Sequence, residues 1–190
     1  MSLNPLNFGI NNLVEILENL KVDKEFNRKF NKIQKSIVNC LKRGSKLIVA
    51  GNGGSASQAE HFVAEIVGRY KKKRNSLPAL ALSSNTSTIT AIGNDFGYEN
   101  IFSQQISSLA NKNDLIILFT TSGKSKNIIN AIKLCAQKKY ECIVFCGNKG
   151  TLKNSTATVL RAGGGDTARI QEIQLFLSHV ICEYVDKNFN

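Results

Sequence analysis

The chain of 190 residues contains only two histidines, and each has an oxygen-bearing side chain at a helical spacing from it. Glu65 follows His61 by four residues and Gln171 precedes His179 by eight, so each pair would share one face of a helix. Imidazole nitrogens with carboxylate and amide oxygens suit Zn²⁺ or a similar divalent ion. A carboxylate and an imidazole can also move protons. The structural alternative for His61 and Glu65 is a solvated pair on a helix surface.

Two loops rich in glycine or hydroxyl groups could hold a phosphate. Gly51–Ser55 follows an apolar run and opens a helix-like stretch, a place where backbone N–H groups face an anion. It matches neither a Walker A loop nor GxGxxG, so alone it is more often a tight turn, with Ser55 as a helix cap or ligand donor. Thr120–Ser125 holds four hydroxyls and one glycine at an expected helix start, whereas a cap needs one hydroxyl. Together the loops predict a phosphate site, while Gly93–Gly97 is expected to be a turn with Asx caps.

Composition and charge exclude several classes of protein. With 42% apolar and 21% charged residues, the chain has the balance of a soluble globular protein and the length for one core. No apolar run nears the roughly 18 residues of a membrane span, and no signal-peptide pattern occurs, so we expect a cytoplasmic protein without a membrane partner. The net charge of +11 is spread out, with one run at Lys71–Arg74, which favours a solvated basic surface over nucleic-acid binding. The five cysteines lack CxxC spacing and are expected to be reduced and buried.

The apolar pattern predicts the elements that must position these groups. Helical periodicity covers 8–20 and 23–42, within a segment 1–44 that we expect to be an oligomer interface preceding a domain at 45–190. Short apolar runs occur at 46–50, 79–82, 114–119, 141–146 and 157–161. Helix-compatible stretches lie at 56–69, 86–92, 99–110, 126–138 and 168–187. The alternation predicts an α/β fold with a five-stranded, doubly wound parallel sheet, whose ligands collect at the carboxyl ends of the strands, where both loops lie.

Several motifs, kept in order and spacing, resemble those of one family. They are Ala50–Ser55, His61–Glu65, Gly68–Tyr70, Gly93–Gly97, Thr121–Ser125, and Arg169–Glu172 with His179. From the N-terminal helices to the last helix, the chain is similar to the phosphoheptose isomerases, which are sugar-isomerase (SIS) domain proteins. The resemblance implies interconversion of D-sedoheptulose 7-phosphate and D-glycero-D-manno-heptose 7-phosphate through an enediol. That reaction is the first step toward ADP- or GDP-heptose for bacterial surface polysaccharide such as lipopolysaccharide.

The resemblance also implies a homotetramer with sites at subunit interfaces and one Zn²⁺ per subunit. The metal ligands would be His61, Glu65, Gln171 and His179. Glu65 would be the catalytic base and His179 the catalytic acid on the opposite side of the sugar phosphate. The substrate-binding residues would be Asn52, Gly53, Gly54, Ser55, Glu65, Asn94, Asp95, Thr120, Thr121, Ser122, Ser125 and Gln171.

Two positions depart from the family's pattern, and two other functions stay open. Ala168 stands where some members have Asp, which leaves the role of that carboxylate in doubt unless Asp166 supplies it. Thr120 stands where Ser also occurs and keeps the hydroxyl.

Some related SIS-domain proteins are non-catalytic tetramers that bind a protein such as the replication initiator, and a sugar-phosphate-binding regulator is a further alternative. The complete set of four predicted metal ligands favours the enzyme, because a scaffold has no physical need of it.

Overall fold

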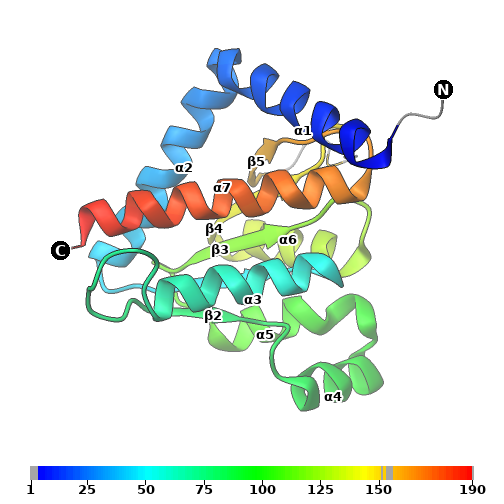
Figure 1. Ribbon diagram of the computed structural model, residues 1–190. Coiled ribbons are helices and arrows are strands. Elements are labelled where there is room, and N and C mark those ends of the chain that lie inside the picture. Colours follow the sequence, from blue (N-terminus) through cyan, green and yellow to red (C-terminus); the bar gives the residue numbers. More distant parts are fainter. Residues whose placement is uncertain (1–3, 151, 153–155, 190) are drawn as a thin grey trace.

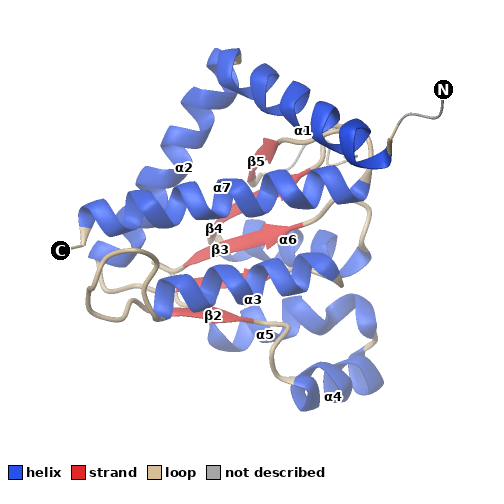
Figure 2. Cartoon of the chain, viewed as in Figure 1, coloured by secondary structure: helices blue, strands red, loops and turns tan. Residues whose placement is uncertain are grey.

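The predicted parallel sheet is confirmed. The structure, a computed structural model, describes residues 4–150, 152 and 156–189. Five parallel strands lie in the order β2-β1-β3-β4-β5 (Figures 1 and 2). They are β1 (Leu47–Ala50), β2 (Ala79–Ala81), β3 (Leu115–Phe119), β4 (Glu141–Cys146) and β5 (Thr158–Arg161). β1 and β3 are buried along their whole length, which explains why their sequences are continuously apolar rather than alternating.

Helices cover both faces of this sheet. They are α1 (Pro5–Val22), α2 (Lys24–Lys42), α3 (Gly54–Val67), α4 (Thr86–Phe96), the 3₁₀ helix η1 (Tyr98–Asn100), α5 (Ile101–Leu109), α6 (Lys126–Lys138) and α7 (Thr167–Asn188). α2, α3 and α7 cover one face, and α5 and α6 cover the other (Figure 1). In β1, Leu47 and Val49 point to the first group of helices and Ile48 and Ala50 to the second. None of the described helices is long and apolar enough to cross a membrane.

The two N-terminal helices contribute differently to the core. α2 begins after Asp23, whose Oδ1 accepts a hydrogen bond from the Phe26 N–H at 2.9 Å. Its apolar stripe, predicted from the sequence, is buried in the same cluster as the sheet and α7. No residue of Pro5–Val22 is buried, and Leu6 and Phe8 are 67% and 57% exposed. The oligomer interface at 1–44 and the domain at 45–190 stay predictions, although α2 shares the core of the sheet.

The expectation that the cysteines are buried is confirmed. All five are free and buried. Burial raises the pKa of the Cys40 thiol to about 11 and that of the Cys182 thiol to about 12. The thiolate, which is the reactive form, is therefore suppressed at both positions near neutral pH.

The prediction of a turn at Gly93–Gly97 is wrong. α4 continues through Phe96, so Asn94 and Asp95 lie in its last turn. The helix ends only at Gly97, whose φ of +85° favours glycine. Asn and Asp are weak helix formers, but their cost is below about 1 kcal/mol per residue. Packing of Ile89 and Ile92 against the core outweighs that cost.

The start of α3 also differs from the expectation. Gly53, with a φ of +54°, is the N-cap residue, and Gly54 is the first residue of the helix. Ser55 therefore lies inside α3, is buried and does not cap the helix. Its own N–H donates to the Asn52 carbonyl at 3.0 Å, which closes the turn on itself. Ser55 as a substrate contact stays a prediction.

Candidate active site

His61 and His179 meet where α3 and α7 run side by side (Figure 1). Their Nε2 atoms are 2.9 Å apart, so one ring donates and the other accepts a hydrogen bond. Glu65, one turn after His61, places Oε1 3.7 Å from His61 Nε2. The fold thus brings together three predicted residues from two helices that are far apart in the sequence. The accepting nitrogen commits its single lone pair to this hydrogen bond, so it can take a proton or bind a metal ion only when the Nε2 contact opens.

Tyr70 fixes the orientation of the His179 ring. The two rings are stacked, with centroids 5.5 Å apart and planes inclined by 22°. Tyr70 lies in the loop that follows α3, within the Gly68–Tyr70 motif. Its contact with His179 was not predicted, because a loop aromatic carries no local signal of its partner.

Gln171 lies at the beginning of α3 rather than beside the imidazoles. A Cβ atom at Gly54 would lie 2.4 Å from Gln171 Nε2, so only glycine leaves room for the amide there. The Gln171 carbonyl accepts a hydrogen bond from Gln58 Nε2 at 2.5 Å. Because His179 is eight residues further along α7, about two helical turns separate it from Gln171.

The four predicted metal ligands have suitable donor atoms for a metal ion, but only some of them lie close together. Imidazole nitrogens and a carboxylate oxygen are ligands that Zn²⁺ prefers. Across the described parts of the chain, however, no group of three or more His, Cys, Asp or Glu side chains is arranged so that it could hold a metal ion. His61 is the neighbour of both His179 and Glu65. Binding would have to draw Glu65 and Gln171 toward the imidazole pair.

The hydroxyl-rich loop Thr120–Ser125 connects β3 to α6. Thr120 Oγ1 accepts from the Gly123 N–H at 3.1 Å, and Ser122 Oγ accepts from the Lys124 N–H at 3.2 Å. Each hydroxyl therefore uses its oxygen within the loop and keeps its hydrogen for an outside acceptor. Ser125 is the N-cap residue of α6, yet its side chain makes no capping hydrogen bond. This arrangement is suited to an anion at the beginning of a helix.

Asn52 links the glycine turn to the hydroxyl-rich loop. Its side chain exchanges two hydrogen bonds of 2.9 Å with that of Asn127, in the first turn of α6. The Tyr98 hydroxyl also donates to Asn52 Oδ1 at 3.4 Å. A cavity of about 430 Å³ is lined by Asn52, Tyr98, Glu99, Ser125, Lys126 and Asn127. Sequence reasoning missed Asn127, whose only signal is a polar side chain directly after the hydroxyl-rich loop.

Two other acidic positions have local partners. Asn94 Nδ2 donates to Asp95 Oδ1 at 2.8 Å, and both side chains are solvent-accessible near the end of α4. Their contact with substrate stays a prediction. Asp166 is the N-cap of α7 and accepts from the Arg169 N–H at 3.0 Å. Its carboxylate is thus engaged in capping, two residues before Ala168.

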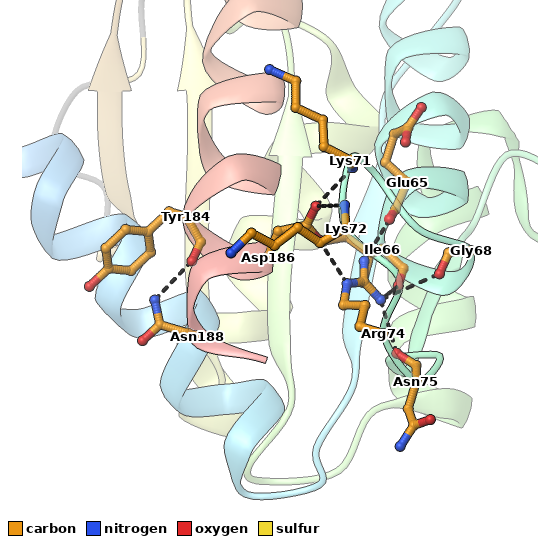
Figure 3. Close-up of polar contacts among 10 residues, drawn as sticks. All are labelled: Glu65, Ile66, Gly68, Lys71, Lys72, Arg74, Asn75, Tyr184, Asp186 and Asn188. Atoms are coloured by element: carbon orange, nitrogen blue, oxygen red, sulfur yellow. Dashed lines mark hydrogen bonds and ion pairs between the residues drawn. The ribbon is translucent and has the colours of Figure 1, made fainter. Parts of the chain in front are cut away.

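The charge pattern predicted that the run Lys71–Arg74 is solvated, and for Arg74 this prediction is wrong. The Arg74 side chain is 1% exposed and pairs with Asp186 on α7 (Figure 3). Burial of Asp186 raises its pKa, but hydrogen bonds from the Lys72 and Lys71 N–H groups and from Arg74 outweigh burial. The pKa of Asp186 therefore lies below its usual value. Arg74 is buried because a fixed anion from a distant helix compensates its charge.

Comparison with known proteins relates the whole arrangement to one family. A family model of the SIS domain matches residues 10–147. A phosphoheptose isomerase of Campylobacter jejuni is 44% identical over 151 residues, which are 79% of this chain and 81% of the relative. That of Aliarcobacter butzleri is 42% identical over 171 residues, 90% of each chain. The structure of a phosphoheptose isomerase from Francisella tularensis matches with a TM-score of 0.89 at 30% identity, covering 98% of this chain and 99% of that one. With this agreement in sequence and in fold, the chain belongs to the phosphoheptose isomerase family of SIS-domain proteins, which are aldose–ketose isomerases.

Proposed function

We propose that the protein converts D-sedoheptulose 7-phosphate to D-glycero-D-manno-heptose 7-phosphate in the cytoplasm, as the first step toward heptose for bacterial surface polysaccharide. The observation that carries the proposal is the hydrogen-bonded pair of His61 and His179 with the Glu65 carboxylate beside it. Aldose–ketose isomerisation needs a base and an acid that act on neighbouring positions of the sugar. This cluster offers both.

The proton transfers follow from the two side chains. Glu65 removes a proton from C1, and His179 gives a proton to the C2 carbonyl oxygen, which forms an enediol. A proton then returns to C2 while the C1 hydroxyl loses its own, which leaves the carbonyl at C1. His61 holds His179 through the Nε2 contact, in which one ring donates and the other accepts.

Substrate binding is assigned to the other end of α3. The Thr120–Ser125 hydroxyls and the beginning of α6 hold the phosphate, and Asn52 faces the cavity beside them. Fixing the phosphate at this edge would hold C1 and C2 of a bound sugar for reaction. Asn94 and Asp95 would contribute from α4.

We propose a homotetramer in which neighbouring subunits complete each site. The hydroxyl-rich loop lies at the carboxyl edge of the sheet, whereas the histidine pair lies on the outer side of α3 and α7. The exposed apolar side chains of α1 support an interface on that side of the chain. They are Leu6, Phe8, Ile10, Val14 and Val22.

One Zn²⁺ per subunit completes the proposal. His61, His179 and Glu65 would hold it, together with Gln171. A bound divalent ion supplies a Lewis acid that polarises the substrate carbonyl. The meeting of two imidazoles at their Nε2 atoms and the adjacent carboxylate oxygen support this assignment.

The test is incubation with D-sedoheptulose 7-phosphate, with and without a chelator, followed by NMR detection of the aldoheptose. We expect conversion by the untreated protein and a lower rate with chelator. Glu65→Gln should bind the sugar phosphate but turn over about 10² to 10⁴ times more slowly. Glu60→Gln alters an exposed carboxylate of the same helix and should change neither property.

Each part of the proposal has its own contradicting result. An unchanged rate after metal removal would contradict the metal site. Near wild-type turnover by Glu65→Gln would contradict its role as base. Absence of product with and without chelator would contradict the isomerase activity itself.

A further inference from the structure

A buried ion pair joins the loop after α3 to the last turns of α7 (Figure 3). Arg74 Nε lies 3.0 Å from Asp186 Oδ1, and the two side chains are 1% and 2% exposed. The proton transfers described above use neither residue. Arg74 nevertheless contacts the backbone of the proposed base, and Asp186 contacts the backbone directly after Tyr70, whose ring is stacked on the proposed acid.

Arg74 holds the end of α3. Its Nη2 donates to the Glu65 carbonyl at 2.7 Å, and its Nη1 donates to the Ile66 carbonyl at 2.8 Å. The last carbonyls of a helix have no partner within it, so a buried guanidinium there satisfies them and fixes their position. One of the two carbonyls belongs to Glu65 itself.

Asp186 holds the loop that carries Tyr70. Its Oδ2 accepts from the Lys71 N–H at 2.8 Å and from the Lys72 N–H at 2.9 Å. These two residues directly follow Tyr70, whose ring is stacked on His179. One carboxylate therefore binds Arg74 with one oxygen and the Tyr70 loop with the other.

We propose that Arg74 and Asp186 are positioning residues for the isomerisation, an inference that rests on the proposed function. Arg74 fixes the position of the Glu65 backbone in the last turns of α3. Asp186 sets the Tyr70 ring, and through it the orientation of His179. The Arg74–Asp186 ion pair therefore fixes the position of Glu65 relative to His179, although neither charged group is part of the active site.

Stabilisation of the fold does not require an ion pair between Arg74 and Asp186. Desolvating two charges costs free energy, and well-packed apolar side chains can join two elements as firmly. Apolar contacts lack direction, however. The guanidinium and the carboxylate each select individual backbone groups at defined angles, which specifies where the end of α3 and the loop lie relative to α7.

The test exploits the presence of only two histidines in the chain. The Tyr70 ring current should displace the NMR signals of the His179 ring protons, and Tyr70→Leu provides their unstacked position. We expect Asp186→Asn and Arg74→Lys to move these signals toward that position. Both variants should lower kcat about 10- to 100-fold, the scale of a small misplacement of catalytic groups. KM should change by less than about threefold, since the phosphate site is untouched.

Tyr70→Phe is the conservative rescue, because it keeps the ring. It should retain the His179 signals and most of kcat, whereas Tyr70→Leu should lose both. This comparison keeps the inference testable if the variants of the buried pair fail to fold.

Two matched controls separate positioning from stability. Asp114 has the same kinds of partner as Asp186, accepting from the Asn111 N–H at 2.7 Å, the Lys46 N–H at 3.0 Å and Lys46 Nζ at 2.5 Å. Asp114→Asn should lower stability without moving the His179 signals or kcat. Glu183→Gln removes the exposed ion pair with Lys71, which joins the same loop to the same helix, and should leave kcat unchanged.

The inference is overturned if folded Asp186→Asn and Arg74→Lys keep the wild-type His179 signals, or if Asp114→Asn changes them equally. It is also overturned if Tyr70→Leu retains wild-type kcat. Absence of isomerase activity in the wild-type protein would contradict the proposed function instead. The NMR comparison would still decide whether the buried pair positions His179.

Discussion

Asn52 and Asn127, 75 residues apart, exchange hydrogen bonds through both ends of their side-chain amides. The exchange joins the turn after β1 to the first turn of α6, which follows the neighbouring strand β3. Two loops that the sequence predicts at one edge of the sheet are thereby held in fixed relation. The contact also orients Asn52 toward the cavity beside the hydroxyl-rich loop.

Asn127→Ala should therefore weaken substrate binding more than turnover. It removes both hydrogen bonds from Asn52 to Asn127 and leaves only the longer one from the Tyr98 hydroxyl, at a cost of about 1 to 3 kcal/mol for the unpaired amide nitrogen. We expect KM for the sugar phosphate to rise about tenfold while kcat changes little. Steady-state kinetics would measure the split, with Lys133→Ala on the exposed side of α6 as the control. A fall in kcat at constant KM would contradict a binding role.

Gly54→Ala should displace the Gln171 amide without breaking α3. The added Cβ would meet the amide at 2.4 Å, and alanine is favoured over glycine in a helix by about 1 kcal/mol. We expect unchanged helix content by circular dichroism and lower zinc retention by elemental analysis after dialysis. Ser57→Ala, on the exposed side of the same helix, should retain the metal. Equal zinc content in both variants would argue against Gln171 as a ligand.

Lysines on the exposed apolar face of α1 should dissociate the oligomer. Ile10 and Val14 are four residues apart and 49% and 46% exposed, and no residue of α1 is buried. Ile10→Lys combined with Val14→Lys should leave the fold intact and reduce the molar mass measured by light scattering. Glu15→Lys, at an exposed position about 100° around α1 from Val14, should not. An unchanged mass in the double variant would place the interface elsewhere.

Asp114 should make stability depend on pH in acid. Burial raises its pKa, but donation from Lys46 Nζ and from the Asn111 and Lys46 N–H groups outweighs burial, so the pKa lies below its usual value. A carboxyl whose pKa is lower in the folded state stabilises the fold above the unfolded pKa of about 3.9. That contribution is lost as the pH falls through the folded pKa. Urea unfolding across this range should show a steeper acid loss for the wild type than for Asp114→Asn, and equal slopes would contradict the assignment.

Sequence patterns predicted the sheet and half of the site for identifiable reasons. Strands covered on both faces are continuously apolar, so β1 and β3 were recognisable without knowledge of their partners. His61 and Glu65 share one helix face, and that spacing is local. The meeting of His61 with His179 depended on family resemblance, because it arises from helices that pack 118 residues apart.

The features that sequence reasoning missed depend on partners at a distance. Arg74 ends a run of cations that resembles a solvated surface, and only Asp186, 112 residues later, makes its burial possible. Asn127 has no local signature, because its partner lies on another loop. The prediction of a turn at Gly93–Gly97 was wrong for the opposite reason. Its residues carry a local turn signal, and the packing of α4 outweighs that signal.

The position of α7 after all five strands in the sequence has a consequence during synthesis. α7 covers the same face of the sheet as α2 and α3, and it supplies both His179 and Asp186. A growing polypeptide that has emerged only as far as β5 exposes the part of that face that α7 will cover to chaperones and proteases. Activity and protection from degradation should therefore arise together, when the last helix leaves the ribosome.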